Sequence, residues 1–213
     1  MAETREIQVV KDNYEKQNTY RIQKGRYNKA IKDGYYFEAL LIVYALLEDR
    51  LRSFIYYIGG ISSHTSSKLD TGKTIKDNLR AIYFGSAEKA EGKNLSLSVI
   101  SNKIRLVSEV VDWVINAEGE LEDDYLKVLK KELEGCVDLD GTQQVLKKVS
   151  KWIKYRNEIM HALMNKKVED LQEQLCDKVV EGMELVDFLD NQVKSLRRSK
   201  GIRKKMKLGV EYR

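Results

Sequence analysis

The chain contains no proline in its 213 residues. Proline removes a backbone donor and interrupts helices, so its absence from a chain rich in Leu, Lys, Glu and Ile favours helices. Hydrophobic residues make up 42% of the chain and charged residues 33%, a balance typical of a globular protein rather than a disordered one. The length is sufficient for one domain with a useful core. The composition therefore predicts a single all-α domain.

Cysteine usage and hydropathy bear on the compartment. The two cysteines, Cys136 and Cys176, are too few for a disulfide framework and fit a reducing cytoplasm. The first ten residues lack the apolar stretch of a signal peptide. The longest apolar run, residues 37–47, is interrupted by Glu38 and is too short to span a bilayer. We expect a cytoplasmic protein without a membrane segment.

The positive charge is concentrated at the C-terminus. Residues 194–213 contain nine Lys or Arg and one Glu, a net charge of +8, whereas the whole chain carries +5 and the first 193 residues about −3. Such a segment fits nucleic-acid binding, and it equally fits a solvated, frayed terminus. We expect a helical bundle over residues 1–196, followed by a basic tail over residues 197–213.

Hydrophobic spacing predicts the helices. No stretch shows sustained alternation of apolar and polar residues, as a half-buried strand would. Gly59 and Gly60 are expected to end one helix, and Thr74 and Thr142 to cap the starts of two others. The expected architecture is a bundle of six or seven mainly antiparallel helices, over residues 7–32, 35–58, 74–84, 96–116, 121–133, 142–165 and 168–196.

Two of these helices carry a charged residue within an apolar row. Glu48 interrupts the row formed by Phe37, Leu41, Tyr44, Leu51, Ile55 and Ile58, and Arg156 the row formed by Val149, Ile153, Met160 and Leu163. A charge that faces a core costs several kcal/mol unless it is paired. We therefore predict that Glu48 faces Arg156. The pair could be purely structural or part of a site, or each side chain could instead reach the surface on its own. These residues alone leave the three readings open.

The residues after Arg156 favour a site. Asn157 follows directly, and His161 lies one turn beyond Asn157 on the same flank of the helix. A guanidinium, an amide and an imidazole on one helix could hold a phosphate, position a ribose and move a proton.

The segment RNEIMH, Arg156 to His161, resembles the signature of the HEPN superfamily, an Arg and a His separated by four to six residues, often with a polar residue after the Arg. The segment GYYFEALLIVYALLEDRLR is similar to the opening helix of that family, and Glu48 matches its glutamate. The resemblance extends over about residues 29–196. Some family toxins have a tyrosine two residues after the His, where this chain has Leu163, so silencing through such a tyrosine is not expected.

The resemblance implies a function. Many HEPN proteins are metal-independent RNA endonucleases of toxin–antitoxin, abortive-infection and CRISPR-linked defence systems, and they commonly dimerise so that two motifs form one site. It implies that Arg156 and His161 are catalytic, that Asn157 orients the phosphate or ribose, and that Glu48 holds Arg156. Partners would be RNA, a second copy of the chain and an antitoxin protein. Weaker substrate-binding candidates are Lys151, Lys154, Arg197 and Arg198.

Other readings stay open. A HEPN-like bundle could bind RNA, a nucleotide or a partner protein without catalysis, and a helical scaffold would need neither Arg156 nor His161. The two Cys and two His are scattered, so neither a zinc site nor another cofactor is expected. His64 lies in a Ser- and Gly-rich loop and is expected to be exposed.

Overall fold

The computed structural model describes residues 13–162, 165, 167–199 and 201–208. Within this part the chain is helical, and its only β-type pairing is an isolated bridge between Lys68 and Ser96. The predicted all-α bundle is confirmed, and seven of the helices described have 12 residues or more. The helices are α1 (Asn13–Lys32), α2 (Tyr36–Tyr57), α3 (Lys73–Phe84), α4 (Ala87–Ala90), α5 (Ile100–Asn116), α6 (Asp124–Cys136), α7 (Leu139–Ala162), α8 (Val168–Ser199) and α9 (Gly201–Lys205).

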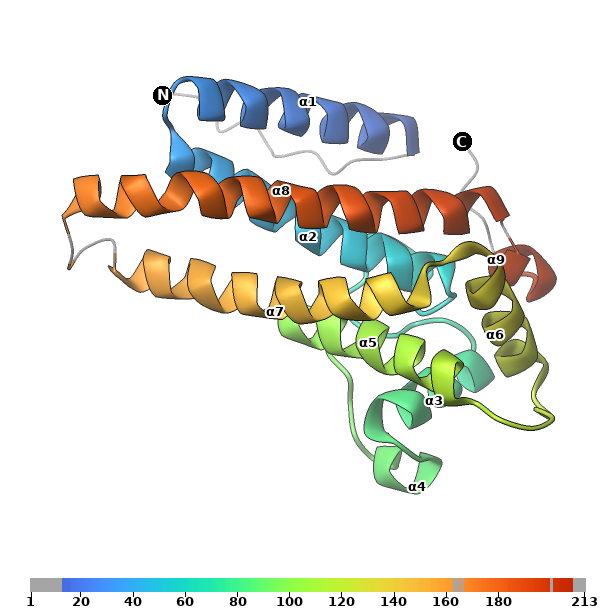
Figure 1. Ribbon diagram of the computed structural model, residues 1–213. Helices are drawn as coiled ribbons and strands as arrows, with labels where there is room; N and C mark the ends of the chain where they lie inside the picture. The colour runs from blue at the N-terminus through green and yellow to red at the C-terminus, as the bar shows by residue number, and fades with distance from the viewer. Residues whose placement is uncertain (1–12, 163–164, 166, 200, 209–213) are drawn as a thin grey trace, which may run out of the picture.

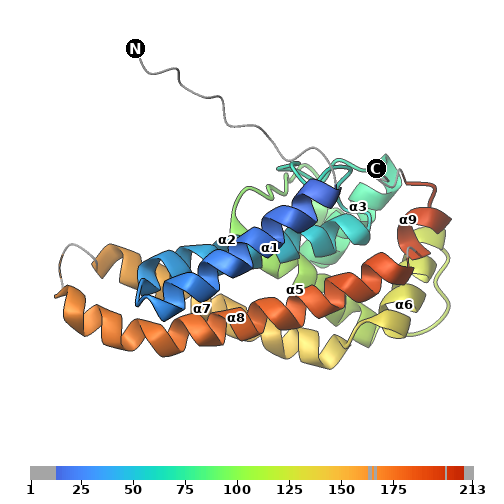
Figure 2. The ribbon, with the colours of Figure 1, turned by 90° about the horizontal axis from the view of Figure 1, so that it is seen from above.

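Helix α2 lies at the centre of the bundle (Figure 1). It packs most extensively on α8, with α1 on one side and α5 on the other, while α7 packs on α8 and α5. Figure 2 shows α1 lying along α2. Helices α6 and α9 pack together at the end of the bundle where α8 ends. None of the helices in the described part is both long and apolar enough to cross a membrane.

The directions of the central helices are clear in Figure 1. Arg50 of α2 pairs with Asp190 of α8 at 2.7 Å, and both helices run from left to right in Figure 1, so this central pair is parallel. Helices α7 and α8 are antiparallel, and the Trp152 indole donates to the carbonyl oxygen of Lys178 at 2.7 Å. A Cβ on Gly182 would lie 2.6 Å from the same indole. This close packing fixes the position of α7 on α8 at Trp152, one turn before Arg156.

The end of α2 is confirmed at the predicted glycines. Gly59 has a φ of 89°, its amide donates to Tyr56, and the Gly60 amide donates to Ile55. These two bonds form a Schellman motif, which uses the left-handed conformation that glycine adopts without strain.

The two predicted threonine caps are wrong. Helix α7 begins at Leu139, because the Asp138 carboxylate accepts from the Gly141 amide at 2.9 Å, and Thr142 is buried inside the helix. Helix α3 begins at Lys73 after Gly72, without a side-chain cap. Aspartate caps a helix as well as threonine does, so the earlier residue begins α7.

The chain stays packed beyond residue 196, where the sequence suggested that the bundle ends. Helix α8 continues to Ser199, and α9 buries Ile202 and Arg203. The Arg203 guanidinium donates to the carbonyl oxygens of Tyr56 at 2.8 Å and Ile61 at 3.1 Å. Residues 201–203 are therefore part of the core and not a solvated terminus.

Candidate functional site

The last turns of α7 carry the three predicted catalytic residues. Arg156 is half-buried, whereas Asn157 and His161 are exposed. Asn157 and His161 are four residues apart on one helix, so their side chains lie one above the other on the same flank. Leu163, which the sequence analysis also singled out, lies outside the described residues.

The Arg156 guanidinium rests on an aromatic ring. Its central carbon lies 4.4 Å from the centre of the Tyr44 ring on α2, and Nη1 donates to Oδ1 of Asn157 at 3.1 Å. The Nε atom is buried and has no hydrogen-bond partner among the side chains that the structure describes. The ring supports one face of the guanidinium, and the hydrogen bond to the Asn157 side-chain amide limits its rotation. The guanidinium is therefore held in one orientation.

The predicted ion pair between Glu48 and Arg156 is wrong. Oε1 of Glu48 accepts from Lys103 of α5 at 2.9 Å and from Arg52 at 3.3 Å. The Glu48 side chain is 30% exposed. In the same row Leu51, Ile55 and Ile58 are buried, whereas Leu41 is exposed, so the row leaves the core toward the start of α2. Glu48 therefore sits at the edge of the core, where it binds cations other than Arg156.

Lys103 is the cation that the sequence analysis missed. Its side chain is completely buried, and burial lowers its pKa below the ordinary lysine value, against the opposing effect of Glu48. It lies between Ile100 and Val107, at spacings of three and four residues. That is the same interruption of an apolar row that drew attention to Glu48, so the signal was present in α5.

Because Glu48 pairs elsewhere, the predicted counterion of Arg156 is not in place. Among the side chains that the structure describes, no carboxylate lies within 4 Å of its guanidinium, and Glu48 pairs with Lys103 and Arg52 instead. A guanidinium that is held on a ring and lacks an acidic partner is suited to bind an anion such as a phosphate.

The weaker substrate-binding candidates fall into two groups. Lys151 and Lys154 are exposed on α7, with Lys154 at 4.0 Å from Glu158, and so lie near Arg156. Arg197 and Arg198 lie near the C-terminal end of α8, whereas Arg156 lies toward the opposite end of the bundle (Figure 1). The structure does not bring this second group to the site.

The expectation that His64 is simply exposed is wrong. Its ring stacks on Tyr56, with the ring centres 4.2 Å apart, and its Nδ1 lies 2.9 Å from Nζ of Lys16. Lys16 also pairs with Asp49 at 2.9 Å. Burial, and then the charge of Lys16, lower the pKa of His64 to about 3. These contacts between a loop, α1 and α2 could not be read from the sequence of the loop.

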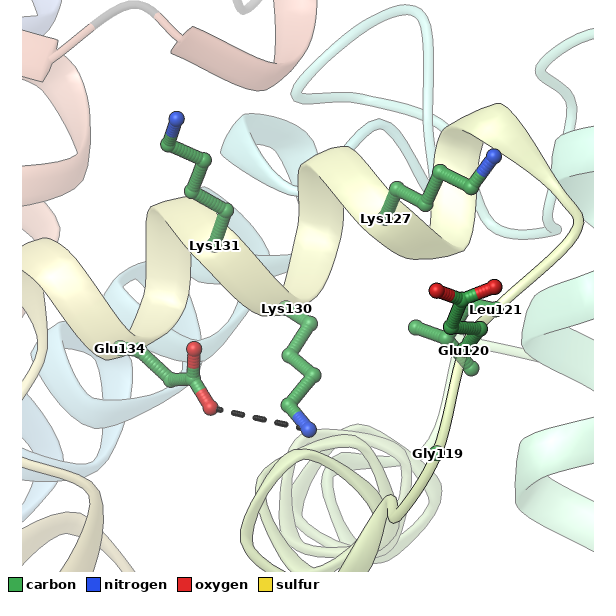
Figure 3. A pocket seen from close by; sticks show the side chains of 7 residues that line it. All are labelled: Gly119, Glu120, Leu121, Lys127, Lys130, Lys131 and Glu134. Carbon is green, nitrogen blue, oxygen red and sulfur yellow. Dashed lines mark ion pairs between the residues drawn. The ribbon is translucent and has the colours of Figure 1, made fainter.

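A hollow of about 470 Å³ between residues 119–121 and α6 contains three lysines. Figure 3 shows the side chains of Lys127, Lys130 and Lys131 pointing in different directions. Lys130 donates to the carbonyl oxygen of Ala117 and lies 3.9 Å from Glu134. Because the three amines do not converge, this hollow is a weaker candidate than the Arg156 region.

Within the described part of the chain, no cluster of three or more His, Cys, Asp or Glu residues is arranged to hold a metal ion. Comparison of the chain with protein-family models, curated proteins and solved structures gave no match.

Proposed function

We propose that this protein is a HEPN-like RNA endonuclease in which Arg156 and His161 act on a phosphodiester bond. The observation that carries the proposal is the Arg156 guanidinium, which is held on the Tyr44 ring and has no acidic partner among the side chains that the structure describes. An exposed amide and an exposed imidazole lie on the same two turns of α7. The proposal also uses the resemblance of RNEIMH to the HEPN signature.

The chemistry requires one attack and two proton transfers. The 2′-oxygen of the ribose attacks the adjacent phosphorus, and its proton passes to a base. The bond from phosphorus to the 5′-oxygen breaks, and the leaving oxygen takes a proton from an acid. The products are a 2′,3′-cyclic phosphate and a 5′-hydroxyl. Arg156 would stabilise the charge on the phosphoryl oxygens, and His161 would transfer protons.

Two copies of the chain would supply one histidine for each proton transfer. The His161 ring makes no hydrogen bond with a side chain that the structure describes, and in this proposal the second copy or the substrate orients it. Leu41 and Ala45, both exposed on α2, adjoin Tyr44 and offer an apolar strip for the second copy. The same resemblance supports a role as a toxin or defence effector that an antitoxin protein restrains.

The test is cleavage of a mixed RNA in EDTA by the wild type, His161→Ala and Arg156→Ala, with Lys148→Ala of the same helix as a matched control. We expect cyclic-phosphate ends from the wild type and the control, and none from the other two variants. Equal behaviour of all four proteins would refute the assignment. Light scattering should show a dimer that Leu41→Glu dissociates, and a wild type that remains monomeric even with RNA would refute the shared site.

The alternative is a bundle that binds RNA, a nucleotide or a partner protein without cutting. The unoriented His161 ring favours it, since a binding site needs Arg156 and Asn157 but no proton transfer. In the same experiment this alternative predicts RNA binding that Arg156→Ala weakens and His161→Ala leaves unchanged, with no cleavage by any of the proteins.

A further inference from the structure

A groove of about 290 Å³ runs between α5 and α7. Its apolar floor is formed by Ile104 of α5 and by Leu146 and Ile153 of α7. Ser101, Ser108 and Ser150 line it with hydroxyl groups. An aliphatic floor with several hydroxyls can take the flat face of a base or a ribose and bond to its polar edge.

The groove leads to the candidate site. Helices α5 and α7 run antiparallel (Figure 1), and Gln143 is bonded to Asp112 at one end. Ser101 and Ile153 both line the groove toward the other end. The next turn of α7 after Ile153 carries Asn157. At about 100° per residue, Ser150, Asn157 and His161 fall within about 40° of one another around α7. The groove and the two exposed site residues therefore share one flank of the helix.

Two cations line the groove, and they differ in whether they are free to bind a phosphate. Arg105 is occupied, because it pairs with Glu109 at 3.4 Å and lies 4.4 Å from the Tyr83 ring. Lys147 is exposed and forms no ion pair with any residue in the described part of the chain. An unpaired ammonium at the rim of a groove attracts a phosphate, with a strength that falls as salt is added.

We propose that the α5–α7 groove binds the nucleotide next to the cleaved phosphate, with Lys147 on the neighbouring phosphate. This inference rests on the proposed function and assigns its substrate as a single strand. The groove volume of 290 Å³ is near the lower limit of small-ligand sites, about 300–1,000 Å³. It has room for one nucleotide-sized group and not for a duplex, and single strands expose their base edges for such binding.

The test uses a labelled single-stranded 2′-O-methyl RNA, which cannot undergo attack by its 2′-oxygen, and measures binding by fluorescence anisotropy. Lys147→Glu is compared with Lys148→Glu, because both lysines are exposed neighbours on α7 and Lys148 does not line the groove. We expect Lys147→Glu to weaken binding on the order of tenfold and to flatten its salt dependence by about one unit of slope. Lys148→Glu should weaken it less than about twofold, the change expected from net charge alone.

A second variant tests the shape of the groove. Ser150→Leu fills it without changing charge, and Gln144→Leu places the same side chain on an exposed position outside it. We expect only Ser150→Leu to weaken binding of the single strand. Equal effects of the two lysine variants, equal effects of the two leucine variants, or a wild type that does not bind the probe would overturn the groove assignment.

The groove assignment and the nuclease assignment can fail independently of each other. If the wild type cuts RNA through Arg156 and His161 but the paired variants behave alike, the groove assignment fails and the nuclease stands. If Lys147→Glu and Ser150→Leu selectively weaken binding but no RNA is cut, the groove stands and the nuclease fails.

Discussion

The Arg156 guanidinium lies 4.4 Å from the centre of the Tyr44 ring, so the candidate site spans α7 and α2. The contact stabilises a cation on the inner side of α7 that has no carboxylate partner among the side chains that the structure describes. It also makes Tyr44 a positioning residue, which acts on a substrate only through the orientation of Arg156.

Substitution of Tyr44 should therefore change the proposed ribonuclease activity more than stability. A cation–π contact contributes about 0.5–2 kcal/mol, so Tyr44→Leu should lower the cleavage rate by a few-fold to about thirtyfold. Tyr44→Phe keeps the ring and should retain most of the activity. Rates and melting temperatures of the wild type and both variants check this. A Tyr44→Phe enzyme as slow as Tyr44→Leu would show that the ring face is not what positions Arg156.

The contact between Glu48 and Lys103 predicts an asymmetry in stability. Glu48→Ala leaves the buried Lys103 ammonium without its carboxylate and should cost about 3 kcal/mol. Lys103→Met replaces the ammonium with an apolar group, while Glu48 keeps Arg52 and its exposure to water, so the cost should be below about 1.5 kcal/mol. Urea unfolding of both variants measures the difference. Equal losses would mean that burial of Lys103 does not depend on Glu48.

These two contacts also show which features of the site could be predicted from the sequence. The rows containing Glu48 and Arg156 correctly identified residues at the inner edge of their helices, because helical periodicity is a local property. Their partners are set by how the helices are rotated and by which neighbour lies opposite. Lys103 belongs to a third helix, so a pairing between two conspicuous charges was the natural choice and the wrong one.

Some helix ends could likewise be predicted from local sequence, and others could not. The glycine pair after α2 was predictable, because its left-handed backbone needs a particular residue type. The start of α7 was not, since Asp138 and Thr142 are both good caps and only packing decides between them. The burial of Arg203 was hidden because its acceptors, the carbonyls of Tyr56 and Ile61, are more than 140 positions away in the sequence.

Arg203 should accordingly stabilise the fold. Arg203→Met removes two charge-assisted hydrogen bonds and leaves two buried carbonyl oxygens without this donor, a loss of about 3 kcal/mol. The adjacent Lys204 is exposed, so Lys204→Met should change stability by less than about 0.5 kcal/mol. Chemical unfolding of both variants compares them directly. Similar stabilities would imply that α9 does not contribute to the cooperative core.

His64 should make the protein lose stability in mild acid. Its pKa in the folded state is about 3, because the ring is buried beside Lys16 and a proton would bring two cations within 2.9 Å of each other. The unfolded chain takes up that proton below about pH 6.5, whereas the folded chain does not, so this contribution is complete above pH 6.5 and is lost as the pH falls toward 3. Between pH 7 and pH 5 the wild type should lose about 1–2 kcal/mol more than His64→Gln, which cannot titrate. Unfolding free energies at the two pH values test this, and because the carboxylates of Asp49 and Asp70 are common to both proteins, parallel losses would show that His64 takes up its proton in the folded state.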